Sequence, residues 1–304
     1  MTAHSPLSPA SPRSPERVED AALLTGRAQF LDDLPEPAGC LHLAILRSPE
    51  AHARITAIEV EAARALPGVA AVLTGADVAA ITRPLMVGVR LPMECWPIAQ
   101  DVVRYVGEPV ALVVASSRYV AEDALALIEV SYERRAPVVA PRDALSDDTV
   151  LHESVGTNLV SERRFRYGDP EAAFARAPHR IEISVSYPRN AVTPIECYGL
   201  IAAHDPHENA FDVTANFQGP FSIHAVLSRA LRVPGNRLRM RTPPASGGNN
   251  LTKPLEHIGI PDGRDPRAII AHDTPYQGKT PAARPAALPS WSHGGARPWH
   301  DPIG

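Results

Sequence analysis

The sequence predicts a mixed α/β fold of the α+β class, because strand-like and helix-like segments interleave along the chain. Apolar residues alternate over 40–45, as in a strand with one buried face. Residues 110–115 form a continuous apolar run, which favours a central strand covered on both faces. Residues 120–128 repeat apolar side chains at helical spacing. We therefore expect one domain over 17–145.

The other elements of this domain follow from shorter signals. A strand is expected at 58–66, running into a helix that Pro67-Gly68 ends, and another strand at 69–73. Ser116 or Ser117 can cap the helix after the long apolar run, and Val130 begins one more strand. The expected core residues are Leu43, Ile45, Val69, Val113 and Leu127.

A second region is expected over 146–250, after a linker rich in Asp, Pro and Ala. Asp169-Pro170-Glu171 is typical of a helix start, and residues 181–187 alternate strictly, which predicts a half-buried strand. Residues 200–203 and 211–217 predict a strand pair joined by a polar turn. Pro220 opens a helix with one buried face, and 238–240 predict a final short strand.

Composition and charge exclude several classes of protein. The chain holds 32 prolines among 304 residues, concentrated at its ends, so we expect disorder over 1–16 and 251–304. The net charge is −4 and no basic block exists, which argues against nucleic-acid binding. No apolar stretch is long enough for a membrane span, and the leader lacks the apolar centre of a secretory signal. A cytoplasmic location is expected.

The most informative candidate site combines Gln218 with Gly247 and Gly248. Gln218 stands where a strand ends and a helix begins, and backbone N–H groups at a helix start attract polar or anionic groups. The two glycines follow the next strand and allow close approach of a ligand to the backbone. One rim of a cofactor pocket would result. The alternative is a polar cap and an ordinary turn.

Other polar residues carry less information. His204 and His207 flank Asp205-Pro206, which favours a surface turn over a metal site, and no metal ligands are assigned. Glu196 lies in an apolar stretch, where a structural hydrogen bond is the favoured role and a functional one the alternative. Cys40, Cys95 and Cys197 are too far apart in sequence for a local zinc or iron–sulfur motif.

Several ordered motifs carry a family resemblance. The motifs are Arg17-Val18-Glu19-Asp20, Phe30-Leu31-Asp32-Asp33, Arg47-Ser48-Pro49-Glu50-Ala51-His52-Ala53, Val106-Gly107-Glu108-Pro109-Val110-Ala111 and Tyr119-Val120-Ala121-Glu122-Asp123-Ala124. Over 17–145 they resemble the α/β hammerhead domain of the large subunits of xanthine dehydrogenase, aldehyde oxidase and carbon monoxide dehydrogenase. Gly168-Asp169-Pro170-Glu171 and Thr193-Pro194-Ile195-Glu196 extend the resemblance into the start of a molybdopterin-binding domain.

The resemblance implies a role for the candidate site. Gln218 matches the family glutamine beside the molybdenum oxo group, and Gly247 and Gly248 match the approach to a Gly-Gly-x-Phe-Gly loop. This chain continues with Asn250-Leu251 where the family has Phe-Gly, and the resemblance ends there. The family's catalytic glutamate is therefore not expected in this chain, so no catalytic residue is assigned. The change of composition after Asn249 suggests, as a hypothesis, a reading-frame slip.

The resemblance implies a truncated large subunit of a molybdenum hydroxylase, inactive alone. The family reaction is oxidative hydroxylation of aldehydes or N-heterocycles, or oxidation of carbon monoxide, at a molybdopterin centre that this chain is not expected to retain. The implied partners are an FAD-binding medium subunit and an iron–sulfur small subunit. The alternative is a non-catalytic module that keeps the hammerhead fold to bind sibling subunits.

Overall fold

The computed structural model describes residues 18–86, 93–146, 148–185, 196, 198–216, 219–243 and 269–272. Its helices are α1 (Asp20–Leu24), α2 (Glu61–Arg64), α3 (Gly75–Ile81), α4 (Arg118–Leu125), α5 (Pro170–Arg176) and α6 (Pro220–Ala230), with 3-10 turns at Leu31–Asp33, Asp143–Ser146 and Gly235–Arg237. None of the helices in this described part of the chain is long and apolar enough to cross a membrane.

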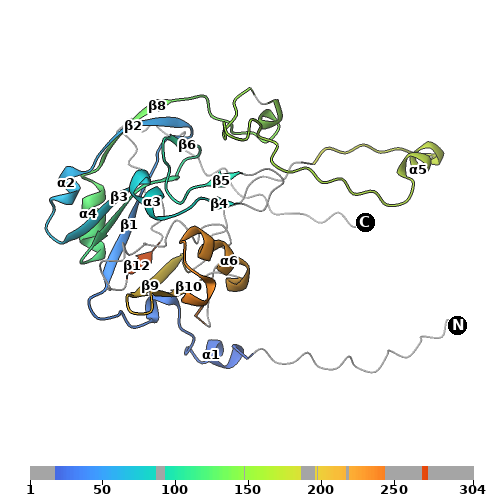
Figure 1. Ribbon diagram of the computed structural model, residues 1–304. Helices are drawn as coiled ribbons and strands as arrows, with labels where there is room; N and C mark the ends of the chain where they lie inside the picture. Colours follow the sequence, from blue (N-terminus) through green and yellow to red (C-terminus); the bar gives the residue numbers. More distant parts are fainter. Residues whose placement is uncertain are drawn as a thin grey trace, which may run out of the picture.

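The strands form three sheets (Figure 1). They are β1 (Leu41–Arg47), β2 (Ala53–Glu59), β3 (Val69–Thr74), β4 (Leu85–Met86), β5 (Glu94–Cys95), β6 (Val102–Val103), β7 (Pro109–Ala115), β8 (Glu129–Arg134), β9 (Gly199–Asp205), β10 (Ala210–Ala215), β11 (Leu238–Arg241) and β12 (Ile269–His272). A seven-stranded sheet has the order β11-β10-β9-β12-β1-β7-β3, and smaller sheets have the orders β6-β2-β8 and β4-β5. Helices and sheets are both present, as the α+β prediction requires.

Strand β7 is the central strand that the apolar run predicted. It lies between β1 and β3, and all seven of its residues are buried. Leu112 and Val114 join one apolar cluster, while Ala111 and Val113 join another on the opposite face. Both faces of the strand are therefore covered, which is why its sequence contains no polar residue.

Helix α4 covers the second of these clusters, and its end corrects one prediction. Ser117 Oγ accepts a hydrogen bond from Val120 N at 3.3 Å, as expected of a cap. Ala121 and Ala124 are buried, but the helix ends at Leu125. Leu127 lies beyond the helix and is 40% exposed, so its predicted burial is wrong. Ile128 takes the place in the core instead.

Of the other expected core residues, Leu43, Ile45 and Val113 are buried and Val69 is half-buried against the same cluster as Val113.

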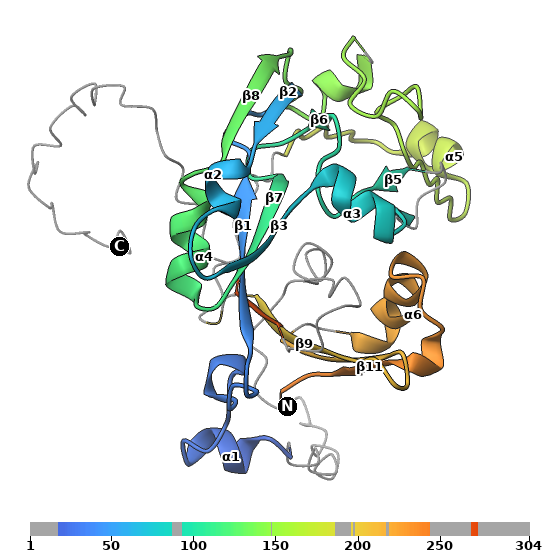
Figure 2. The same cartoon turned by 60° about the vertical axis from the view of Figure 1, so that its left-hand side comes forward.

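The seven-stranded sheet joins the two regions that the sequence analysis separated. Strands β1, β3 and β7 come from the first region, while β9, β10 and β11 come from the second (Figure 2). One apolar cluster contains residues from both regions, including Ile45 and Leu112 from the first and Leu200 and Leu227 from the second. The two regions thus share one hydrophobic core.

Strand β12 departs from the expectation of a disordered tail at Ile269–His272. It pairs in parallel with β1 and antiparallel with β9, so it connects the two halves of the sheet. A short apolar run can add to a sheet wherever two neighbouring strand edges offer free backbone groups. The rest of 251–304 lies outside the described residues.

The strand predicted over 181–187 is not formed in its described part. Residues 181–185 belong to no strand, and Ile181, Ile183 and Val185 are 85%, 80% and 85% exposed. The alternation of apolar residues predicted a buried face, but the described chain supplies no neighbouring strand or core to cover it. Residues 186 and 187 lie outside the described residues.

Candidate functional site

The residues of the candidate site follow two neighbouring strands in the sequence. Strand β10 pairs in parallel with β11, with Phe211 opposite Leu238 and Thr214 opposite Arg241. Because parallel strands end at the same edge of a sheet, the segments that follow β10 and β11 leave from one edge. Gln218 comes three residues after the end of β10, and Gly247 comes six residues after the end of β11. We call this the β10–β11 edge.

Helix α6 begins directly after Gln218. Gly219, at its N-cap, has φ 67° and ψ 55°, a left-handed conformation that glycine adopts without strain. Pro220 occupies the first helical position, where its missing N–H costs nothing. The first turn contains no acidic side chain. The start of α6 can therefore accept a polar or anionic group without competition from a carboxylate of its own.

Asn216 fixes the point at which the chain leaves β10. Its side chain is 1% exposed, and its Oδ1 accepts a hydrogen bond from Gly199 N at 2.9 Å. Asn216 N donates in return to Gly199 O at 3.4 Å. The exit of β10 is thus tied to the start of β9. Sequence reasoning did not identify Asn216, because its partner is 17 residues away.

Arg232 fixes the other end of α6. Its guanidinium donates to Thr82 O at 2.8 Å and to Ala80 O at 3.3 Å, at the end of α3. Arg83 N donates to Ala230 O at 2.8 Å across the same junction. Arg232 also has φ 56°, an uncommon value for a residue with a side chain. These contacts hold α6 against the first region of the chain.

Gln218, Gly247 and Gly248 themselves lie outside the described residues. The structure therefore places the strands and the helix that lead to them, through Asn216, Gly219 and Pro243, and leaves their roles as predictions.

Two other candidates have structural roles. Leu31 N donates to Glu196 Oε1 at 2.8 Å, which is the structural hydrogen bond that the sequence favoured for Glu196. His204 is buried, with Nε2 3.2 Å from Asn209 Oδ1, and its ring lies tilted against that of Phe211 with the ring centroids 4.7 Å apart. Within the described ranges, no group of three or more His, Cys, Asp or Glu side chains could hold a metal ion.

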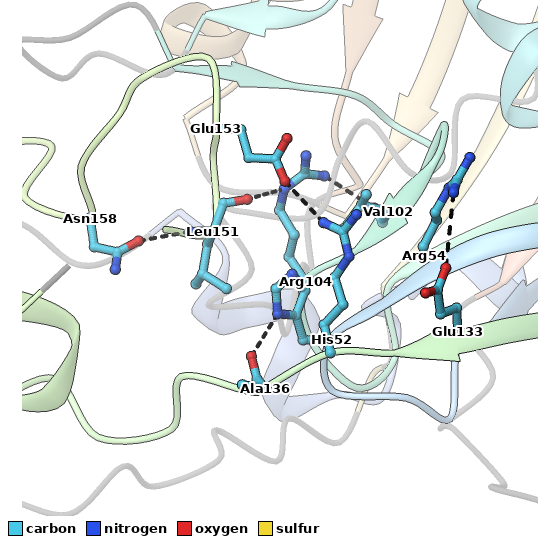
Figure 3. Close-up of polar contacts among 10 residues, drawn as sticks. His52, Arg54, Val102, Arg104, Glu133, Ala136, Leu151, Glu153 and Asn158 are labelled. Carbon is cyan, nitrogen blue, oxygen red and sulfur yellow. Dashed lines mark hydrogen bonds and ion pairs between the residues drawn. The ribbon is translucent and has the colours of Figure 1, made fainter. Parts of the chain in front are cut away.

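A loop between the two regions is fastened to the three-stranded sheet (Figure 3). Arg104 Nε donates to Leu151 O at 2.8 Å, and Leu151 N donates to Asn158 Oδ1 at 2.9 Å. Arg135 pairs with Glu153 at 3.0 Å. We call these contacts the clasp. They fix the position at which the chain enters the second region.

His152 lies within the clasp, where its surroundings disfavour the protonated imidazole. Burial lowers the pKa of its imidazole, and the positive charge of Arg104 lowers that pKa further. A neutral ring avoids repulsion from the guanidinium beside it.

Comparisons with known proteins match both regions. Residues 25–136 match the family described as the aldehyde oxidase and xanthine dehydrogenase α/β hammerhead domain. Residues 151–249 match the molybdopterin cofactor-binding domain.

Individual relatives agree with these matches. The nicotine 6-hydroxylase large subunit of Paenarthrobacter nicotinovorans is 36% identical over 240 residues, which are 76% of this chain and 29% of the relative. The carbon monoxide dehydrogenase large chain of Hydrogenophaga pseudoflava is 32% identical over 247 residues, which are 76% of this chain and 30% of the relative. The chain thus spans about 30% of the length of these two relatives.

A solved structure shows the same fold. The crystal structure of quinoline 2-oxidoreductase from Pseudomonas putida 86 superposes with a TM-score of 0.76 at 31% identity, covering 85% of this chain and 34% of that chain. Several relatives are named as the large chain or a subunit of a complex, so the relatives work in multi-subunit assemblies. Over residues 25–249 the chain belongs to the xanthine dehydrogenase and aldehyde oxidase family of molybdopterin-binding large subunits.

Proposed function

We propose that this chain supplies the hammerhead domain and the first part of the molybdopterin-binding domain of a molybdenum hydroxylase large subunit. The domain limits that we propose are 17–145 and 146–250. The observation that supports the proposal is the β10–β11 edge, because β10 and β11 run parallel and the segments with Gln218 and Gly247 follow these two strands in the sequence.

The described residues around this edge fit a polar, anionic cofactor. The first turn of α6 has no acidic side chain, and the left-handed Gly219 starts the helix without a side chain that would block its N–H groups. Gln218, Gly247 and Gly248 would contact the molybdopterin. When bound, the molybdenum centre would accept electrons from the substrate. The role of this chain would be to bind and orient that cofactor along one wall.

The reaction that we propose for the complete large subunit is oxidative hydroxylation of an aldehyde or an N-heterocycle, or oxidation of carbon monoxide. We assign no catalytic residue to this chain, and we expect it to be inactive alone. An FAD-binding medium subunit and an iron–sulfur small subunit are the proposed electron-transfer partners, and the cytoplasm is the proposed location. A ligand pocket normally encloses most of its ligand, and the β10–β11 edge offers one wall of it.

A fusion protein tests the proposal. Residues 1–249 are joined to the part of the nicotine 6-hydroxylase large subunit that follows its matched region, and the purified fusion is assayed for bound molybdenum. We expect stoichiometric molybdenum in the fusion and a clear loss of it in Gln218→Ala. Gln29→Ala, at an exposed position, serves as the matched control and should bind as much as the parent. If Gln218→Ala and Gln29→Ala bind equal amounts of molybdenum, Gln218 is not part of the cofactor site.

A further inference from the structure

The second region contains a long projection that nothing in the described structure covers. Residues 159–185, which we call the arm, run out from the clasp to α5 and back (Figure 1). Phe165 and Tyr167 on the outgoing leg are 77% and 86% exposed. Ile181, Ile183 and Val185 on the returning leg are at least 80% exposed. Large side chains rarely gather in this way on a surface that stays in water.

The side chains of both legs alternate. Phe165 and Tyr167 are separated by Arg166, and Ile181, Ile183 and Val185 are separated by Glu182 and Ser184. A period of two gives each leg one apolar side and one polar side when the leg is extended as a strand. β-Branched and aromatic residues are also those that strands favour.

Within the described part of the chain, the backbone of both legs has no hydrogen-bond partner. No backbone hydrogen bond links residues 161–168 or 178–185 to another described residue. Free backbone N–H and C=O groups beside an alternating apolar face are what an extended segment needs to add to the edge of another sheet. At the tip of the arm, Asp169 Oδ1 accepts a hydrogen bond from Ala172 N at 3.1 Å and caps α5.

We propose that the arm is a docking element for the C-terminal part of a large subunit, the part that the curated relatives have beyond the region matching this chain. The inference rests on the proposed function. The arm lies inside the stretch 151–249 that matches the molybdopterin cofactor-binding domain, while the chain spans about 30% of its relatives' length. This C-terminal part, the occupant, would present an apolar surface beside a free strand edge.

The position of the arm supports this occupant over a separate protein. The arm is held at its base by the clasp, through Asn158, and leads on to β9, which is in the same sheet as β10 and β11. A C-terminal part that completes the cofactor pocket at the β10–β11 edge would therefore contact the same sheet to which the arm is connected. The charges of the arm nearly balance, with five arginines and four acidic residues in 159–185, so apolar contact and backbone pairing would hold the occupant.

Hydrogen–deuterium exchange of the arm tests the inference on the fusion described above and on the chain by itself. We expect amides of 161–168 and 179–185 to exchange at least about tenfold more slowly in the fusion, because they become paired. If the fusion is insoluble, the same relative's C-terminal part is added in trans. Unchanged exchange would overturn the inference. Protection that appears in the chain alone and grows with its concentration would also overturn it, because a second copy would be the occupant.

A pair of variants adds a second measurement. Ile181→Ser with Ile183→Ser should lower the melting temperature of the fusion, or weaken binding in trans at least about tenfold, and leave the chain alone unchanged. Val139→Ser is the control, because Val139 is also largely exposed, at 76%, but lies outside the arm. An equal effect of both changes would contradict the inference. A fusion that binds molybdenum with an unprotected arm refutes only the docking role, whereas a protected arm without molybdenum refutes only the proposed function.

Discussion

Gly199 and Asn216 are joined by two hydrogen bonds that run in opposite directions between the start of β9 and the exit of β10. Gly199 N donates to Asn216 Oδ1 at 2.9 Å, and Asn216 N donates to Gly199 O at 3.4 Å. Asn216 is buried and precedes the proposed cofactor contact by two residues. The pair therefore links the stability of the sheet to the geometry of the β10–β11 edge.

Replacing Asn216 with Ala should lower the free energy of unfolding by about 1–3 kcal/mol, because Gly199 N would lose its acceptor while it stays buried. Urea denaturation of the purified chain measures this change. Asn236→Ala, at an exposed position near the end of α6, is the control and should shift the free energy of unfolding by less than about 0.5 kcal/mol. If Asn216→Ala leaves the free energy of unfolding unchanged, the hydrogen bonds between Gly199 and Asn216 do not hold the exit of β10.

Arg232 combines two effects that separate substitutions can resolve. Arg232→Ala removes the hydrogen bonds to Thr82 O and Ala80 O but keeps a side chain at φ 56°. Arg232→Gly removes the same bonds and relieves the left-handed backbone. We expect Gly to be more stable than Ala by about 1 kcal/mol, and both to be less stable than the parent. Thermal unfolding compares the stability of the parent and the two variants. If Arg232→Ala is at least as stable as Arg232→Gly, backbone strain at position 232 is ruled out.

Val113 tests the central strand. It is fully buried in β7, opposite Ala44 of β1 and Val72 of β3. Val113→Asp should cost at least about 3 kcal/mol, because an unpaired charge would enter the core. Val139→Asp places the same charge at an exposed site and should be tolerated. Circular dichroism on heating compares the two variants. If Val113→Asp melts at the same temperature as the parent, the placement of Val113 in the core is wrong.

The sequence predicted the parts of the fold that local patterns encode. The uniform apolar composition of 110–115 indicated β7, and Ser117 and Asp169 were recognisable helix caps. Leu127 was misassigned because helical spacing alone does not show where a helix ends. The strand expected at 181–187 failed in its described part for another reason, since alternation predicts an apolar face and not the partner that covers it.

Long-range contacts limited what could be predicted for the site. Arg232 reaches carbonyls about 150 residues away, and no local pattern marks such a contact. The parallel pairing of β10 with β11 was not part of the prediction, although a connection through a helix favours it. The cofactor was predicted from the family motifs, since a glutamine and two glycines do not by themselves specify molybdopterin.

His152 should make stability depend on pH. Burial and the charge of Arg104 hold the pKa of its imidazole below the ordinary value of 6.5 in the folded chain. As pH falls below about 6.5, the unfolded chain gains a proton that the folded chain resists, so stability is lost. Urea unfolding between pH 7 and pH 5 should show a steeper loss in the parent than in His152→Gln. Identical slopes in the parent and in His152→Gln would contradict this role.

Molybdenum content tests the central claim most directly. Elemental analysis compares the isolated chain with its fusion to the C-terminal part of the nicotine 6-hydroxylase large subunit, both produced in the same molybdopterin-synthesising host. We predict substoichiometric molybdenum in the isolated chain and stoichiometric molybdenum in the fusion, because the β10–β11 edge offers one wall and a bound cofactor needs to be enclosed. Stoichiometric molybdenum in the isolated chain, or none in a correctly folded fusion, would contradict the account.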